Sequence, residues 1–187
     1  MRKNRTPRSS LLSSFTLATA SISLLLSVPA FAKEEAKSAP LTVAMKNSAG
    51  EDVGTIILTE TNKGVKLGLD LHGLTPGEKA IHFHETGDCT GPKFTSAGGH
   101  FNPLGKEHGK KSKNGKHAGD LDNIKVSKGG TVKSDLKTDL VTLSPSDHSL
   151  LKTGGTAVVI HAKEDDYKSQ PAGDAGDRVA CGVISAM

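Results

Sequence analysis

The sequence is poor in aromatic residues, with no Trp, one Tyr and five Phe among its 187 residues. Two of the Phe residues precede residue 33, so a core built by the remainder must consist of Val, Ile, Leu and Ala. A helical period is also missing, because no stretch repeats apolar residues at intervals of three and four. These absences argue against a helical fold and leave short strands as the expected elements.

The chain has almost no net charge once the N-terminal segment is left out of the count. Residues 1–32 combine four basic residues, an apolar-to-small run and the small-x-small motif Ala30-Phe31-Ala32. This pattern predicts a secretory signal peptide cleaved after Ala32, and the run is too short and too rich in Ser and Thr for a membrane anchor. The remainder carries 20 Lys and Arg against 20 Asp and Glu. A nucleic-acid partner is therefore not expected.

Without the predicted signal peptide, the chain is expected to consist of a short tail and one domain. Residues 33–40 are charged and small and are predicted to form a flexible tail. Residues 41–187 make one domain, long enough to bury a single core. Its two cysteines, Cys89 and Cys181, are expected to pair outside the cytoplasm. The disulfide would close a loop of about 90 residues, worth on the order of 4 kcal/mol in the chain-entropy model.

Short strands separated by turn signals fill this domain. The clearest alternation is in Gly64–His72, where Val65, Leu67, Leu69 and Leu71 share one face. The eight predicted strands are Leu41–Lys46, Asp52–Glu60, Gly64–His72, Ala80–Glu85, Asn123–Val126, Thr131–Leu140, Thr156–Ala162 and Ala180–Ser185. They predict an all-β fold, an antiparallel eight-stranded barrel or sandwich.

Potential metal ligands concentrate between residues 82 and 120, with one more at residue 161. The candidates are His82, His84, His100, His108, His117, Asp120 and His161. Seven side chains can serve two four-coordinate metals if one histidine is shared. Histidines with one carboxylate suit Zn²⁺, and an all-nitrogen set suits Cu(II). The alternative is a set of scattered surface histidines or a loose metal-sequestering loop.

Four segments, HFHETGDC, SAGGHFNP, HAGDLDNI and GDAGDRVACGVI, resemble the copper–zinc superoxide dismutases, in particular their bacterial exported forms. The resemblance covers residues 40–187. It implies a Greek-key β fold with long metal-binding and channel loops. It also implies an enzyme that converts superoxide to dioxygen and hydrogen peroxide with a redox-cycling copper and a structural zinc. Such an enzyme would act in the periplasm or be secreted, against extracytoplasmic superoxide.

The resemblance also assigns roles to individual residues. Copper would bind His82, His84, His100 and His161, and zinc would bind His100, His108, His117 and Asp120. His100 would bridge the metals and deliver a proton, and Arg178 would attract and position the superoxide anion. Asp165 would join a copper histidine to a zinc histidine, although the adjacent Asp166 leaves the register open by one residue.

Two other functions stay open at this point. One is an exported protein of the same fold that binds metal without turnover. The other is a zinc hydrolase with three histidines and a water, which leaves most of the seven candidates without a role. Five lysines between residues 106 and 116 are either a solvated face or an attraction for an anionic substrate. The sequence leaves a homodimer open.

Overall fold

A computed structural model describes residues 39–186 of the chain. The predicted signal peptide and most of the predicted tail lie outside the described residues, so both stay predictions. Within that range the one helical element is a 3₁₀ helix, η1 (Thr95–Ala97). The described part of the chain therefore contains no helix able to cross a membrane.

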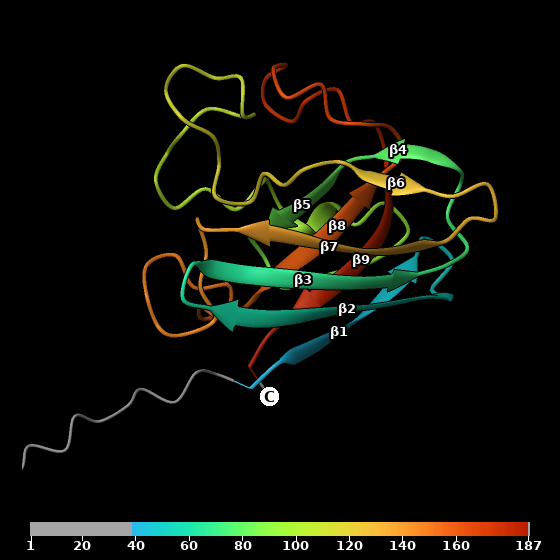
Figure 1. Ribbon diagram of the computed structural model, residues 1–187, viewed down its shortest axis with the longest axis horizontal. Helices are drawn as coiled ribbons and strands as arrows, with labels where there is room; N and C mark the ends of the chain where they lie inside the picture. Colours follow the sequence, from blue (N-terminus) through green and yellow to red (C-terminus); the bar gives the residue numbers. More distant parts are fainter. Residues whose placement is uncertain (1–38, 187) are drawn as a thin grey trace, which may run out of the picture. The chain divides into compact units, whose positions relative to one another are not determined.

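The described domain consists of antiparallel strands, as predicted (Figure 1). The strands are β1 (Leu41–Asn47), β2 (Asp52–Thr61), β3 (Gly64–Leu71), β4 (Gly77–Lys79), β5 (Ile81–His84), β6 (Ile124–Val126), β7 (Val132–Thr138), β8 (Thr156–His161) and β9 (Arg178–Ile184). One sheet has the order β5-β8-β9-β1-β2-β3-β7, and β4 pairs with β6 in a second sheet.

The strand count exceeds the prediction by one because the chain changes partner at Ala80. Before this residue β4 pairs with β6, and after it β5 pairs with β8. Ala80 itself donates its N–H to the Lys163 carbonyl over 2.7 Å and accepts from the His161 N–H over 2.9 Å. The predicted strand Ala80–Glu85 is therefore β5, and β4 is an addition with no apolar alternation to reveal it.

The β4–β6 pair bridges the two ends of the larger sheet. β4 continues into β5 at one end, and β6 turns into β7 at the other through residues 127–131. The neighbour order is thus β1-β2-β3-β7-β6-β4/β5-β8-β9, returning to β1. The connection from β3 to β4 passes over β7 and β6, which is a Greek-key connection.

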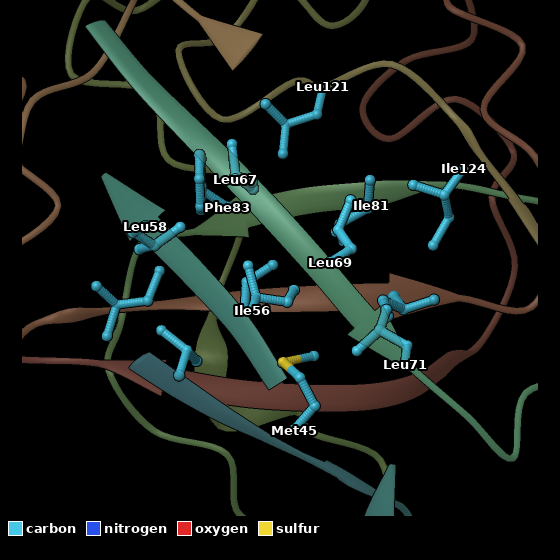
Figure 2. Close-up of a cluster of buried hydrophobic side chains, with 14 of the residues drawn as sticks. Met45, Ile56, Leu58, Leu67, Leu69, Leu71, Ile81, Phe83, Leu121 and Ile124 are labelled. Carbon is cyan, nitrogen blue, oxygen red and sulfur yellow. The ribbon is translucent and has the colours of Figure 1, made fainter. Parts of the chain in front are cut away.

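The core between the strands is largely aliphatic, as predicted, although Met45, Phe83 and Phe101 also belong to it. Figure 2 shows part of this cluster. Along β3 the predicted inward residues are buried and alternate with more exposed ones. Opposite them, Ile81 and Phe83 of β5 are fully buried in the same cluster. Because side chains alternate across a strand, His82 and His84 lie on the other face of β5.

That outer face of β5, β8 and β9 is covered by loops. A second buried cluster lies there, formed by Phe94, Ala97, Ala157, Val159 and Cys181. All six residues of β8 are buried as a result. The predicted disulfide is present between Cys89 and Cys181, 92 residues apart in the sequence. It ties the loop that follows β5 to β9.

Candidate metal centre

Backbone pairing brings the loop ligands to β5. His84 forms an isolated antiparallel bridge with His100, and His82 forms another with Asp120. Between these bridges, Phe83 donates to the Gly119 carbonyl over 2.9 Å and accepts from the Phe101 N–H over 2.8 Å. Ligands far apart in the sequence are therefore fixed in register with the strand that carries His82 and His84.

The structure gathers the predicted ligands into two overlapping groups of buried side chains. The four-histidine group is His82, His84, His100 and His161, and the mixed group is His100, His108, His117 and Asp120. In each group the potential ligand atoms all lie within 4.8 Å of one another. His72 and His148, which have no ligand role in the prediction, lie apart from both groups: His72 is exposed and pairs with Asp52.

The four-histidine group points unpartnered nitrogens at a common point. Four buried ring nitrogens have no hydrogen-bond partner among the described residues: His82 Nδ1, His84 Nε2, His100 Nε2 and His161 Nε2. A buried polar atom without a partner is costly and needs an explanation. A metal ion bound by all four nitrogens would remove this cost, and an all-nitrogen set suits copper.

The opposite nitrogens of these rings fix their tautomers. His84 Nδ1 lies 3.0 Å from the Gly98 carbonyl oxygen, and His161 Nδ1 lies 3.3 Å from that of Gly176. A carbonyl oxygen only accepts, so each Nδ1 carries the proton and each Nε2 presents a lone pair. Both rings are thus prepared as ligands by backbone contacts.

The mixed group converges on one carboxylate oxygen. Asp120 Oδ1 lies 2.8 Å from His100 Nδ1, 3.1 Å from His108 Nδ1 and 3.3 Å from His117 Nδ1. A tetrahedral Zn²⁺ with bonds of about 2.0–2.1 Å requires ligand atoms about 3.3 Å apart. The other Asp120 oxygen accepts from the Gly109 N–H over 2.7 Å, which holds the carboxylate in this orientation.

Asp165 links the two groups from behind. Its Oδ2 lies 2.8 Å from His82 Nε2, and its Oδ1 lies 3.0 Å from His108 Nε2. The Asp165 side chain is fully buried, and its Oδ1 also accepts from the Tyr167 N–H. The neighbouring Asp166 instead accepts from Ser169 at the surface. Of the two alternatives that the sequence left open, Asp165 and Asp166, it is therefore Asp165 that contacts a histidine of each group.

His108 shows why the mixed group needs a cation. Its Nε2 faces Asp165 and its Nδ1 faces Asp120, yet a neutral imidazole carries one proton. The second nitrogen needs either a second proton or a metal ion. Burial disfavours the charged ring, but the two carboxylates prevail and raise the pKa of His108 to about 9. A bound Zn²⁺ would replace that proton.

The other pKa shifts agree with these roles. Burial, aided by the neighbouring histidines, lowers the pKa of His84 to about 2, of His161 to about 3 and of His100 to about 4. These rings are therefore neutral at pH 7, as metal binding requires. Burial opposes the charge on Asp120, but hydrogen bonds from three histidines hold the pKa of its carboxyl far below its usual range.

An open cavity of about 380 Å³ leads to the four-histidine group, and Arg178 lies in its wall. Arg178 Nη1 donates to the Phe94 carbonyl and Nη2 donates to the Gly98 carbonyl, each over 2.6 Å. Burial lowers the pKa of the guanidinium. The side chain is thus a fixed cation at the opening to the four-histidine group. Among the other wall residues are His84, His100, His161, Gln170 and Gly176.

The lysines between residues 106 and 116 are partly committed to structure. Lys116 Nζ donates to the Asp120 carbonyl over 2.8 Å, and Lys111 Nζ donates to the Asp166 carbonyl over 3.0 Å. Lys110 pairs with Asp122. Three of the five lysines therefore brace the loop that carries the mixed group, which accounts for much of the charge run without a substrate.

Sequence reasoning missed the residues that join this loop to the wall of the cavity. Gln170 accepts from the His108 N–H over 2.8 Å and donates to the His108 carbonyl over 2.9 Å. The Tyr167 hydroxyl accepts from the Asn123 N–H over 2.8 Å, and the Lys110 ammonium lies 4.0 Å from the centre of the Tyr167 ring. The only feature of the sequence that could have indicated these contacts is Tyr167, the single tyrosine of the chain.

Comparisons with known proteins agree with this geometry. Residues 53–184 match the family described as copper/zinc superoxide dismutase (SODC). The chain is 48% identical over 164 residues to superoxide dismutase (Cu-Zn) 2 of Aquifex aeolicus, covering 87% of this chain and 94% of that protein. Among solved structures it resembles a SOD-like protein from Bacillus subtilis, with a TM-score of 0.76, 37% identity and coverage of 78% and 99%. The Cu/Zn superoxide dismutase of Brucella abortus gives a TM-score of 0.65, 27% identity and the same coverage.

Proposed function

Because this chain belongs to the copper/zinc superoxide dismutase family, we propose that its two groups of buried ligands hold one copper and one zinc ion. The four-histidine group takes copper, and the mixed group takes zinc. The observation that carries the assignment is the set of four unpartnered buried nitrogens that converge in the four-histidine group. His100 belongs to both groups, so its Nε2 would hold copper and its Nδ1 would hold zinc.

The reaction is the dismutation of superoxide. Copper, when bound, would supply the redox chemistry by alternating between Cu(II) and Cu(I), so that two superoxide ions and two protons give one dioxygen and one hydrogen peroxide. The protein must then bind an anion, exclude competing groups and give access to two protons in each cycle. His100 Nε2, on the cavity wall, could hold and release one of these protons, because the other nitrogen of this ring is fixed beside the Asp120 carboxylate.

Arg178 supports an enzyme over a metal store. A metal store has no need of a cation at the entrance to its copper, whereas an enzyme acting on a small anion gains from one. Two backbone carbonyls fix the guanidinium before the anion arrives, so little freedom is lost on binding. The favourable charge and the fixed orientation together support superoxide as the substrate.

Metal binding without turnover is the second candidate, and one finding favours it. Relatives of this fold carry the name SOD-like as well as superoxide dismutase. The purified chain, loaded with both metals, should disproportionate superoxide in a pulse-radiolysis assay, and the same chain stripped of copper should not. Full copper and zinc occupancy without activity above that copper-free control would select the metal-binding function.

The enzyme acts outside the cytoplasm, in a periplasm or after secretion, where it removes superoxide. The disulfide between Cys89 and Cys181 supports this, because such bonds persist in oxidising compartments. The signal-peptide pattern of residues 1–32 supports it independently. Intact-mass measurement of protein from the native host should give a chain that begins at Lys33. A mass that retains the first 32 residues would contradict the cleavage.

A further inference from the structure

One peptide unit holds two parts of the candidate centre at once. The carbonyl oxygen of Gly98 accepts from His84 Nδ1 over 3.0 Å and from Arg178 Nη2 over 2.6 Å. The first contact fixes the tautomer of a proposed copper ligand, and the second fixes the cation at the entrance. The orientation of the Gly98–Gly99 peptide therefore sets both.

The other end of the same peptide is held by a carboxylate. The Gly99 N–H donates to Glu85 Oε1 over 2.9 Å, and the Glu85 N–H donates to the Gly99 carbonyl over 2.9 Å. The N–H and C=O of a peptide unit point in opposite directions, so a carboxylate on the N–H side both orients and polarises the carbonyl. The carbonyl of Gly98 becomes a better acceptor for its two donors.

The chain makes specific room for this carboxylate. A Cβ atom on Gly98 would lie 2.6 Å from Glu85 Oε1 and 2.7 Å from Glu85 Cγ, and the φ angle of Gly98 is +75°. The positive φ angle favours glycine at this position, and a Cβ there would displace the Glu85 side chain. Gly98 thus leaves the space in which the Glu85 carboxylate lies beside the peptide.

We propose that Glu85 is a positioning residue, which acts through the Gly98–Gly99 peptide to orient Arg178 and His84. The inference rests on the proposed function and extends it to a residue outside the metal ligands. Glu85 is not a catalytic residue, because it lies on the wall of a different hollow, of about 390 Å³, which it shares with Asp147 and Lys152.

A simpler effect of Glu85 has the opposite sign, which makes the two separable. A carboxylate near an anion site repels the anion through space, so its removal alone would tighten anion binding. Loss of positioning would weaken anion binding, because Arg178 and His84 would lose a fixed partner. The direction of the change in anion affinity therefore decides between them.

The experiment measures the affinity of the copper- and zinc-loaded full-length protein for azide, a small anion, by titration of the Cu(II) absorption. Glu85→Gln keeps an acceptor oxygen but removes the charge, and should bind azide within about 2-fold of wild type. Glu85→Asp keeps the charge but is one methylene too short, and should weaken azide binding by roughly 3- to 10-fold. Glu85→Ala should do the same, and Cu(II) electron paramagnetic resonance should change in both weakened variants.

Asp147→Asn is the matched control, since it removes one negative charge from the same hollow and, among the described residues, Asp147 makes no hydrogen bond to the Gly98–Gly99 peptide. It should leave azide binding equal or tighter. Equal affinity in wild type and Glu85→Asp, or tighter binding in Glu85→Ala, would overturn the positioning role. If Glu85→Ala does not fold, the comparison of Glu85→Asp with Glu85→Gln decides. A wild-type protein that binds no copper or no azide would overturn the proposed function, and this inference with it.

Discussion

Replacing Asp165 by Asn tests how the two metal sites are coupled. The amide has one accepting oxygen and one donating nitrogen, where the carboxylate has two acceptors. Oδ1 of Asp165 accepts from both Tyr167 N–H and His108 Nε2, so the amide oxygen of Asn should take this position. The NH₂ group then faces His82 Nε2–H, and two donors oppose each other.

The cost of this substitution should therefore fall on copper. A buried donor left without an acceptor costs about 1–3 kcal/mol, which corresponds to roughly a 5- to 150-fold change in an equilibrium constant. Partners behind metal-binding histidines typically contribute 10- to 100-fold in metal affinity. We expect Asp165→Asn to lower copper affinity by about 10- to 100-fold and zinc affinity by less than about 3-fold.

Competition with chelators of known affinity, for each metal in turn, measures both quantities. Asp166→Asn is the control, because that carboxylate contacts Ser169 rather than either metal group. A loss of zinc with copper retained would show that the amide is placed the other way. Unchanged affinity for both metals, or an equal loss in Asp166→Asn, would refute the reasoning.

Three further predictions follow from charge, covalent linkage and proton binding. Arg178→Ala should keep both metals but lower the superoxide rate by roughly 5- to 30-fold, with a weaker dependence on ionic strength, as pulse radiolysis would show; equal rates at full copper would remove Arg178 from the mechanism. Cys181→Ser should lower the free energy of unfolding by roughly 2–5 kcal/mol in urea titrations, and an unchanged midpoint would contradict this. The metal-free protein should be most stable near pH 6.5. Below this pH the unfolded chain takes up protons that folded His84 and His161, with pKa values of about 2 and about 3, do not. Above pH 6.5, His108 loses its proton in the unfolded chain but keeps it in the folded protein. The stability that this proton contributes therefore falls as the pH rises, and it is lost once the pH passes about 9, the raised pKa of His108. Urea titrations of metal-free protein from pH 4 to pH 9 would measure this, and a flat profile would contradict it.

The sequence predicted strands well where one face of the strand is buried and the other is exposed to solvent, because the residues then alternate between apolar and polar. β3 alternates buried and more exposed residues, and its register could be read directly. β4 could not be found, because Gly77-Glu78-Lys79 has no such alternation and its partner β6 lies far along the chain. Nor did the sequence indicate that Lys79 is buried, with its ammonium donating to the Ala162 carbonyl over 2.7 Å.

The candidate ligands could be predicted because side-chain chemistry and spacing are visible in a sequence. Their supports could not, since the carbonyls of Gly98 and Gly176 are backbone groups whose position depends on the fold. The choice between Asp165 and Asp166 likewise depends on which carboxylate is buried. Gly98 and Gly99, directly before His100, could have indicated that another group packs closely against the backbone at this point.

The two faces of β5 have a consequence for how this family can diverge. Ile81 and Phe83 pack in the core, whereas His82 and His84 lie on the outer face among the candidate metal ligands, so alternate residues of one strand have different tasks. Substitution of the histidines leaves the core side chains of the strand in place. A lineage can therefore abandon its redox chemistry and inherit the barrel intact, free to use the covered outer face for another purpose.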